Sequence, residues 1–128
     1  MPPAASSSRD LQWALDLFAP LARRSSEAAA FVYLDPKWRM VGMRHSASRD
    51  ADSITVAIRT VMRDALSYDA HFLVMAHNHP SGDATPSRDD ILFTRRLARV
   101  LDAIGVTLVD HLIVSANATS SFRQAGLL

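Results

Sequence analysis

The segment His77-Asn78-His79-Pro80-Ser81-Gly82-Asp83-Ala84-Thr85-Pro86-Ser87-Arg88-Asp89-Asp90 separates two apolar stretches, and the rest of the chain is arranged around it. The mostly apolar residues 71–76 before it predict a buried strand that runs from His71 to Asn78. After it, apolar residues recur at helical spacing from Ile91, and Ser87 is a typical helix N-cap. The prolines and glycine of residues 80–86 predict a loop. Polar side chains are therefore expected on a loop between two rigid elements, where binding and catalytic groups are often placed.

Upstream of this segment, the apolar spacing predicts a helix, two strands and a second helix. The first helix begins after a cap at Ser8 or Asp10 and breaks at Pro20, which cannot sit comfortably inside a helix. Residues 28–35 predict a buried strand, Asp35-Pro36-Lys37 a turn, and residues 38–43 a returning strand, while residues 44–50 fit strand or loop. Asp52 or Ser53 caps the second helix. Its predicted buried stripe consists of Ile54, Ala57, Ile58, Val61, Met62, Ala65 and Leu66.

Downstream, the pattern predicts a helix, a long strand and a short final strand. The predicted apolar face of the helix consists of Ile91, Leu92, Leu97, Val100, Leu101 and Ile104. Gly105 is a natural helix stop, residues 106–114 predict one strand, and residues 120–122 a short strand after a turn. Helices and strands are mixed without strict alternation, which predicts an α/β domain built around one mixed sheet.

The composition limits the kind of protein this can be. The 128 residues fit one domain, and a net charge of +1 gives no strong electrostatic case for nucleic acid or an anionic membrane. No apolar run approaches the length of a membrane span, and residues 1–8 lack a signal-peptide pattern, so we expect a cytoplasmic protein. There is no cysteine, so a metal would have to be held by histidine, carboxylate or water.

The two histidines of the segment have the spacing of paired metal ligands. His77 and His79 are two residues apart at the end of a predicted strand, so their side chains point to the same face. Asp90, in the first turn of the next helix, is placed to fold back as a third ligand. Two histidines, one aspartate and a water make an open zinc site of the catalytic type. Manganese, iron and nickel also accept such ligands, and zinc is the expected ion.

Such a site also needs a group that takes a proton from the metal-bound water. Glu27 is the only glutamate of the chain, and it stands at the head of the first predicted strand. Glu27 is therefore the one candidate for a glutamate base, although sequence spacing alone does not place it near the histidines. Ser87 has a hydroxyl that can donate a hydrogen bond to the oxyanion formed in acyl transfer.

Each of these features also has a purely structural interpretation. A histidine pair at a strand end can hydrogen-bond loop carbonyls, and Ser87 with Asp90 has the spacing of a capping box. Asp110 and His111 fit either a pair that orients a ligand imidazole or a buried structural pair, and we favour structural support. Taken together, the histidine pair, the Pro-Ser-Gly loop, the serine and the aspartate favour the metal site.

These residues carry a family resemblance that covers roughly residues 27–122. His77-x-His79, seven residues, Ser87, two residues and Asp90 match the JAMM signature of the MPN metalloprotease superfamily. The longer string from His77 to Asp83, then residues 85–87, Asp90 and Thr94, resembles the bacterial RadC family. Residues 110–113, Asp-His-Leu-Ile, are similar to that family's second characteristic stretch.

The resemblance implies a JAB/MPN fold, which is a single α/β domain with a curved mixed β-sheet flanked by helices. Residues 1–26 would be an N-terminal extension with one helix, and residues 27–128 the RadC-like JAB/MPN domain. The resemblance implies that His77, His79 and Asp90 hold zinc. It implies that Ser87 positions the oxyanion or the water, and that Glu27 corresponds to the superfamily's catalytic glutamate. The implied activity is zinc-dependent hydrolysis of a peptide or isopeptide bond.

Two other functions compete with the hydrolase. The superfamily includes non-catalytic MPN scaffolds, but these generally lose ligands that this chain keeps. A DNA-repair accessory role would use the cluster Arg88, Arg95, Arg96 and Arg99 on one predicted helix. RadC proteins also carry an N-terminal helix-hairpin-helix region associated with DNA, and the 26 residues before Glu27 are too few for it. We expect a stand-alone domain acting on a peptide or protein rather than on nucleic acid.

Overall fold

The computed structural model describes residues 11–47 and 53–128. Its elements are α1 (Gln12–Phe18), the 3-10 helix η2 (Ala19–Arg23), β1 (Ala28–Leu34), β2 (Met40–Ala47), α2 (Ser53–Ser67), β3 (Phe72–Asn78), α3 (Arg88–Ala103), β4 (Thr107–Val114) and β5 (Thr119–Ser121). This order is the one that the sequence predicts. The predicted caps Ser8, Asp10 and Asp52 lie outside the described residues, as does the side chain of Ser53.

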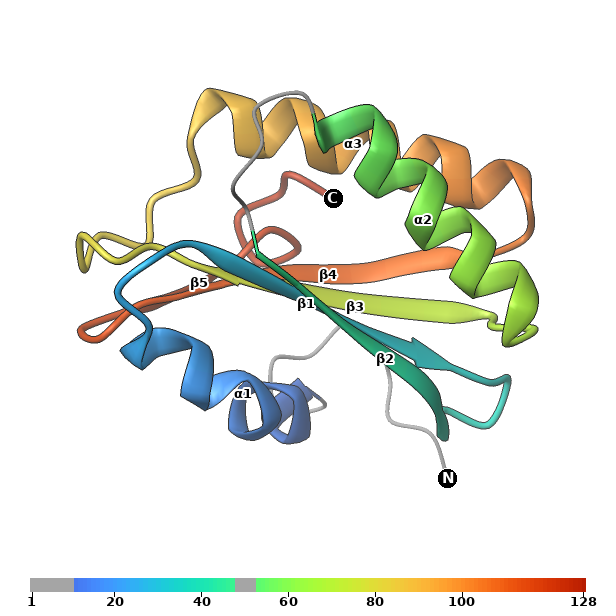
Figure 1. The fold of residues 1–128 in the computed structure, drawn as a ribbon, viewed down its shortest axis with the longest axis horizontal. Coiled ribbons are helices and arrows are strands. Elements are labelled where there is room, and N and C mark those ends of the chain that lie inside the picture. Colours follow the sequence, from blue (N-terminus) through green and yellow to red (C-terminus); the bar gives the residue numbers. More distant parts are fainter. Residues whose placement is uncertain (1–10, 48–52) are drawn as a thin grey trace.

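The five strands form one mixed sheet in the order β2-β1-β3-β4-β5. β1 runs antiparallel to β2 and β3, β3 runs parallel to β4, and β5 returns antiparallel to β4. α1 and η2 cover one face of the sheet, and α2 and α3 cover the other (Figure 1). The predicted α/β single domain with a mixed sheet between helices is therefore confirmed. No helix in the described ranges combines the length and apolar character needed to cross a membrane.

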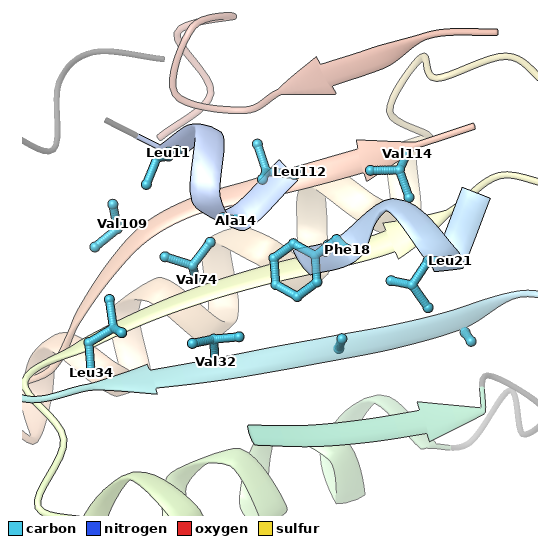
Figure 2. Close-up of a cluster of buried hydrophobic side chains, with 13 residues drawn as sticks. Leu11, Ala14, Phe18, Leu21, Val32, Leu34, Val74, Val109, Leu112 and Val114 are labelled. Atoms are coloured by element: carbon cyan, nitrogen blue, oxygen red, sulfur yellow. The ribbon is translucent and has the colours of Figure 1, made fainter. Parts of the chain in front are cut away.

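The N-terminal helices contribute to the core on one face of the sheet. Phe18 is fully buried and lies among side chains of β1, β3 and β4 (Figure 2). The α-helix ends at Phe18 and the chain continues as the 3-10 helix η2, which has Pro20 in its first turn. This is the predicted break, because proline has no backbone N–H to continue the α-helical hydrogen bonds.

On the other face, α2 and α3 bury most of the predicted stripes, with two exceptions. Ile58, Val61, Ala65, Leu97 and Leu101 belong to a second core cluster, and the side chains of Ile54 and Ala57 lie outside the described part of the chain. The prediction was wrong for Leu66 and Leu92, which are 62% and 53% exposed. Leu66 lies about 100° around its helix from the buried Ala65, and Leu92 lies opposite the buried Thr94.

The hairpin between β1 and β2 turns more widely than predicted. Trp38 has a φ of 62°, in the left-handed region, so it belongs to the turn rather than to the returning strand. The Asp35 carboxylate fixes this turn by accepting the backbone N–H of Arg39 at 2.9 Å. β2 therefore begins at Met40, and it extends to Ala47 through the first part of the stretch that fitted strand or loop.

A β-bulge in β4 changes the face to which its later side chains point. Consecutive residues of β3 pair with Leu108 and Asp110, so Val109 is an extra residue in β4. An extra residue reverses the alternation of side chains beyond it. Leu108 packs in the core beneath α2 and α3, and His111, three residues later, also faces that side and contacts α3.

Candidate metal centre

The predicted site residues meet at the end of the sheet where β1 begins and β3 ends. His77 is the next-to-last residue of β3 and pairs with Ala29, which follows Glu27 by two residues. Because these strands are antiparallel, the start of one lies beside the end of the other. The loop from β3 to α3 and the segment before β1 lie at this same end of the sheet (Figure 1).

The two histidine rings converge on one carboxylate. The Nε2 atoms of His77 and His79 are 2.9 Å apart. Asp90 Oδ1 lies 3.3 Å from His77 Nε2, and Asp90 Oδ2 lies 3.1 Å from His79 Nε2. His77 is buried, while His79 and Asp90 are partly buried. Three side chains of metal-ligating type therefore direct their polar atoms to one point at the edge of the domain.

The proton on His79 is fixed by the loop. Its Nδ1 atom lies 2.8 Å from the carbonyl oxygen of Asp83. A carbonyl oxygen only accepts hydrogen bonds, so Nδ1 carries the proton and Nε2 of the neutral ring carries a lone pair. That lone pair faces the Asp90 carboxylate, which is also an acceptor. Two acceptors this close are stabilised by a proton or a metal cation between them, and imidazole and carboxylate together form a donor set that fits a metal ion.

Asp90 is held in place as part of the helix cap. Ser87 Oγ accepts the backbone N–H of Asp90 at 3.0 Å, and Asp90 Oδ2 accepts the backbone N–H of Ser87 at 2.8 Å. Burial raises the pKa of Asp90, but the charged form of the adjacent His77 ring and the Ser87 amide outweigh burial and hold the pKa well below its usual range. Asp90 is therefore an ionised carboxylate. The capping role of Ser87 uses its oxygen as an acceptor, so its hydroxyl proton remains able to donate.

Glu27 brings a second carboxylate to the same histidines. One ligand atom each from Glu27, His77 and His79 lie within 4.8 Å of one another, so these three residues also form a possible metal-binding group. Glu27 is exposed, and within residues 11–47 and 53–128 no group donates a hydrogen bond to its carboxylate. The histidine pair is thus flanked by a fixed carboxylate, Asp90, and an unconstrained one, Glu27.

The loop that carries His79 is tied to the neighbouring strands at several points. The backbone N–H of His79 donates to the carbonyl of Val114 at 3.1 Å. Ser115 Oγ donates to the carbonyl of Gly82 at 3.0 Å, and Ser120 Oγ donates to the carbonyl of Ala84 at 2.6 Å. These bonds hold the loop against the end of β4, Ser115 just after it, and β5.

Asp110 and His111 have different surroundings. The Asp110 carboxylate accepts the backbone N–H groups of His111 and Arg123 and the hydroxyl of Ser121, which ties down the chain after β5. His111 instead lies 2.6 Å from His77 Nδ1 through its Nε2 atom. Burial lowers the pKa of His111 well below its usual range, so the ring is neutral. His111 therefore contacts a predicted site residue directly.

Asn78, between the two histidines, is a site residue that the sequence analysis did not identify. It is 1% exposed and faces away from His77. Its Oδ1 accepts the backbone N–H of Ala28 at 2.7 Å, and its Nδ2 donates to the carbonyl of Ser26 at 3.0 Å. Asn78 thereby holds the residues on both sides of Glu27. The sequence feature that could have identified Asn78 is its position at a strand end, between two histidines.

We expect Asn78→Ala to lower the free energy of unfolding by roughly 1–3 kcal/mol, because it leaves the buried N–H of Ala28 without an acceptor. Chemical denaturation followed by circular dichroism measures this. The control is Asn117→Ala, an exposed asparagine in the turn before β5, for which a change within about 0.5 kcal/mol is expected. Equal effects of the two substitutions would contradict the role assigned to Asn78.

The chain is similar to known proteins over most of its length. The chain matches the model of the RadC-like JAB domain family over residues 7–127. It is 37% identical over 108 residues to a UPF0758 protein of Neisseria meningitidis serogroup C, covering 84% of this chain and 48% of that protein. A UPF0758 protein of Ruegeria pomeroyi is 40% identical over 108 residues, with the same two coverages. The chain spans about half the length of the curated relatives it matches.

Proposed function

This chain belongs to the RadC-like JAB domain family, and we propose that it is a zinc-dependent metallohydrolase of the JAMM type that cleaves a peptide or isopeptide bond. The observation that carries the proposal is the set of acceptors at the end of the sheet. His79 Nε2 lies 2.9 Å from His77 Nε2 and 3.1 Å from the ionised Asp90. Neutral imidazole and carboxylate are ligands that zinc accepts in catalytic sites.

In this proposal His77, His79 and Asp90 hold the metal. A bound zinc ion would lower the pKa of a water molecule to about 7 and so supply a nucleophile at neutral pH. Glu27 would take the proton of that water and pass it to the leaving nitrogen. Ser87 would donate its hydroxyl proton to the oxyanion that develops on the scissile carbonyl.

The surroundings of the two carboxylates support this division of roles. Asp90 is fixed by the capping box and lies within 3.3 Å of both Nε2 atoms, as a ligand must be held. Glu27 is exposed, and the part of the chain that the structure describes gives its carboxylate no hydrogen-bond donor. A side chain that moves a proton between two partners needs this freedom. Glu27 therefore suits the base, and Asp90 suits the ligand.

The metal content of purified protein tests the proposal. We expect close to one zinc per chain in the wild-type protein and almost none in His77→Ala, because that substitution removes one of the three proposed protein ligands. Inductively coupled plasma mass spectrometry after dialysis measures the content. His71→Ala is the matched control, since His71 is exposed at the opposite end of β3. A wild-type protein that binds no metal from zinc-supplemented buffer would refute the proposed function.

A further inference from the structure

We propose that Thr94 and His111 are positioning residues that fix the proton of His77 on Nδ1 and so present its Nε2 lone pair to the metal. The inference rests on the proposed metal site for its purpose. Its evidence, however, is a chain of short hydrogen bonds that runs from the backbone of α3 to His77. Each link of that chain allows only one position for its proton.

The first link begins at a backbone carbonyl of α3. Thr94 is fully buried, and its Oγ1 lies 2.7 Å from the carbonyl oxygen of Asp90. Two oxygens at this distance repel unless a proton lies between them, and a carbonyl oxygen has none to give. The Thr94 hydroxyl therefore donates to the carbonyl of Asp90, and Thr94 Oγ1 is left only as an acceptor.

The second link passes this constraint to His111. Its Nδ1 lies 2.6 Å from Thr94 Oγ1. Because the hydroxyl proton is already used, the proton in this bond must belong to His111 Nδ1. The ring is 1% exposed and stacks on Phe122 with centroids 4.4 Å apart. Such surroundings favour the uncharged form, so His111 Nε2 carries no proton.

The third link determines the state of His77. His111 Nε2 and His77 Nδ1 are 2.6 Å apart. Since His111 Nε2 only accepts, His77 Nδ1 carries the proton and donates it. The Nε2 of a neutral His77 is then a lone pair, and this is the atom that faces His79 and Asp90. The opposite order of protons would place a hydrogen on His77 Nε2 and block it as a ligand.

The chain also orients the ring. Thr94 and Asp90 lie one helical turn apart in α3, so the helix that supplies the carboxylate also supplies the first donor. His111 reaches this side of the sheet because of the extra residue Val109 in β4. His77 is therefore held between His79 and Asp90 on one side and His111 on the other. Outer hydrogen-bond partners of this kind typically change metal affinity by about 10–100-fold.

The test uses the full chain stripped of metal with a chelator, at a pH well above the ordinary histidine pKa of about 6.5. Long-range ¹H–¹⁵N correlation spectra report which nitrogen of each ring carries the proton. In the wild-type protein we expect both His77 and His111 to be protonated on Nδ1. A wild-type His77 protonated on Nε2 overturns the inference without any variant.

Thr94→Val and Thr94→Ser form the matched pair of variants. Valine has the shape of threonine without the hydroxyl, so we expect the protons of His111 and His77 to shift toward Nε2 and the zinc dissociation constant to rise about 10–100-fold. Serine restores the hydroxyl and should restore both readouts. Wild-type tautomers in Thr94→Val, or a Thr94→Ser that behaves like Thr94→Val, overturns the inference. Wild-type protein with the expected tautomers but no zinc binding would instead refute the proposed function.

Discussion

Replacing Glu27 with glutamine is expected to abolish hydrolysis while leaving the metal bound. Glutamine has the size of glutamate but cannot take up a proton, so the water would keep its proton and the leaving nitrogen would receive none. Loss of a general base typically lowers the rate by about 10²–10⁴-fold. The measurement is turnover of a fluorogenic peptide library and of a lysine isopeptide probe, with zinc content determined on the same preparations.

The two readouts separate the roles open to Glu27. Because one atom each of Glu27, His77 and His79 lie within 4.8 Å of one another, a ligand role is the alternative to the base. Loss of zinc in Glu27→Gln would make Glu27 a ligand. Unchanged turnover with zinc retained would remove Glu27 from the mechanism. Glu27 is exposed, so the substitution is expected to leave the free energy of unfolding within about 0.5 kcal/mol of wild type.

Replacing Asp90 with alanine is expected to empty the site. The carboxylate is the only charged group within 3.3 Å of both Nε2 atoms in the described part of the chain, and its removal leaves two neutral imidazoles to hold a divalent cation. Loss of a residue that only hydrogen-bonds to a metal ligand weakens metal binding by up to roughly 100-fold. We expect loss of the ligand Asp90 itself to raise the zinc dissociation constant by more than this. Titration with a competing chromophoric chelator measures it.

Two further variants make this result specific to the ligand. Asp89→Ala removes the neighbouring exposed carboxylate of the same helical turn, and it should leave the affinity unchanged. Asp90→Asn keeps an oxygen for the Ser87 amide and so preserves the capping box, but it removes the charge. Asp90→Asn is expected to lose zinc while α3 stays capped. Full affinity in Asp90→Asn would show that Asp90 acts on the site only through the helix cap.

Much of the site geometry follows from local sequence rules. The period of two in a strand places His77 and His79 together, and the cap signature at Ser87 places Asp90 in the first turn of α3. The sequence also contains a single candidate for a glutamate base. None of these rules gives the pairing of β1 with β3, which brings Glu27 beside the histidines. The family resemblance supplied that link, and the register between Ala29 and His77 agrees with it.

The parts that could not be predicted depend on contacts between distant segments. Leu66 and Leu92 have helical spacing that fits a buried stripe, but the side of each helix that packs on the sheet is centred on other residues and leaves them exposed. Asn78 is the last residue of the predicted strand, and its role depends on the backbone before β1, which donates a hydrogen bond to it. His111 is the clearest case, because strict alternation through residues 107–114 would assign it to the face opposite Leu108.

The extra residue in β4 also sets how this family can change over evolutionary time. Leu108 and Asp110 pair with consecutive residues of β3, so deletion of Val109 would leave a regular strand in which His111 still faces α3. A register that ran straight through Val109 would instead exchange the two faces of the strand and turn His111 toward α1. The pairing of residues 110–114 with β3 is therefore under tighter selection than the length of the chain at Val109. An alignment of relatives should tolerate a one-residue gap at position 109 wherever the buried histidine is kept.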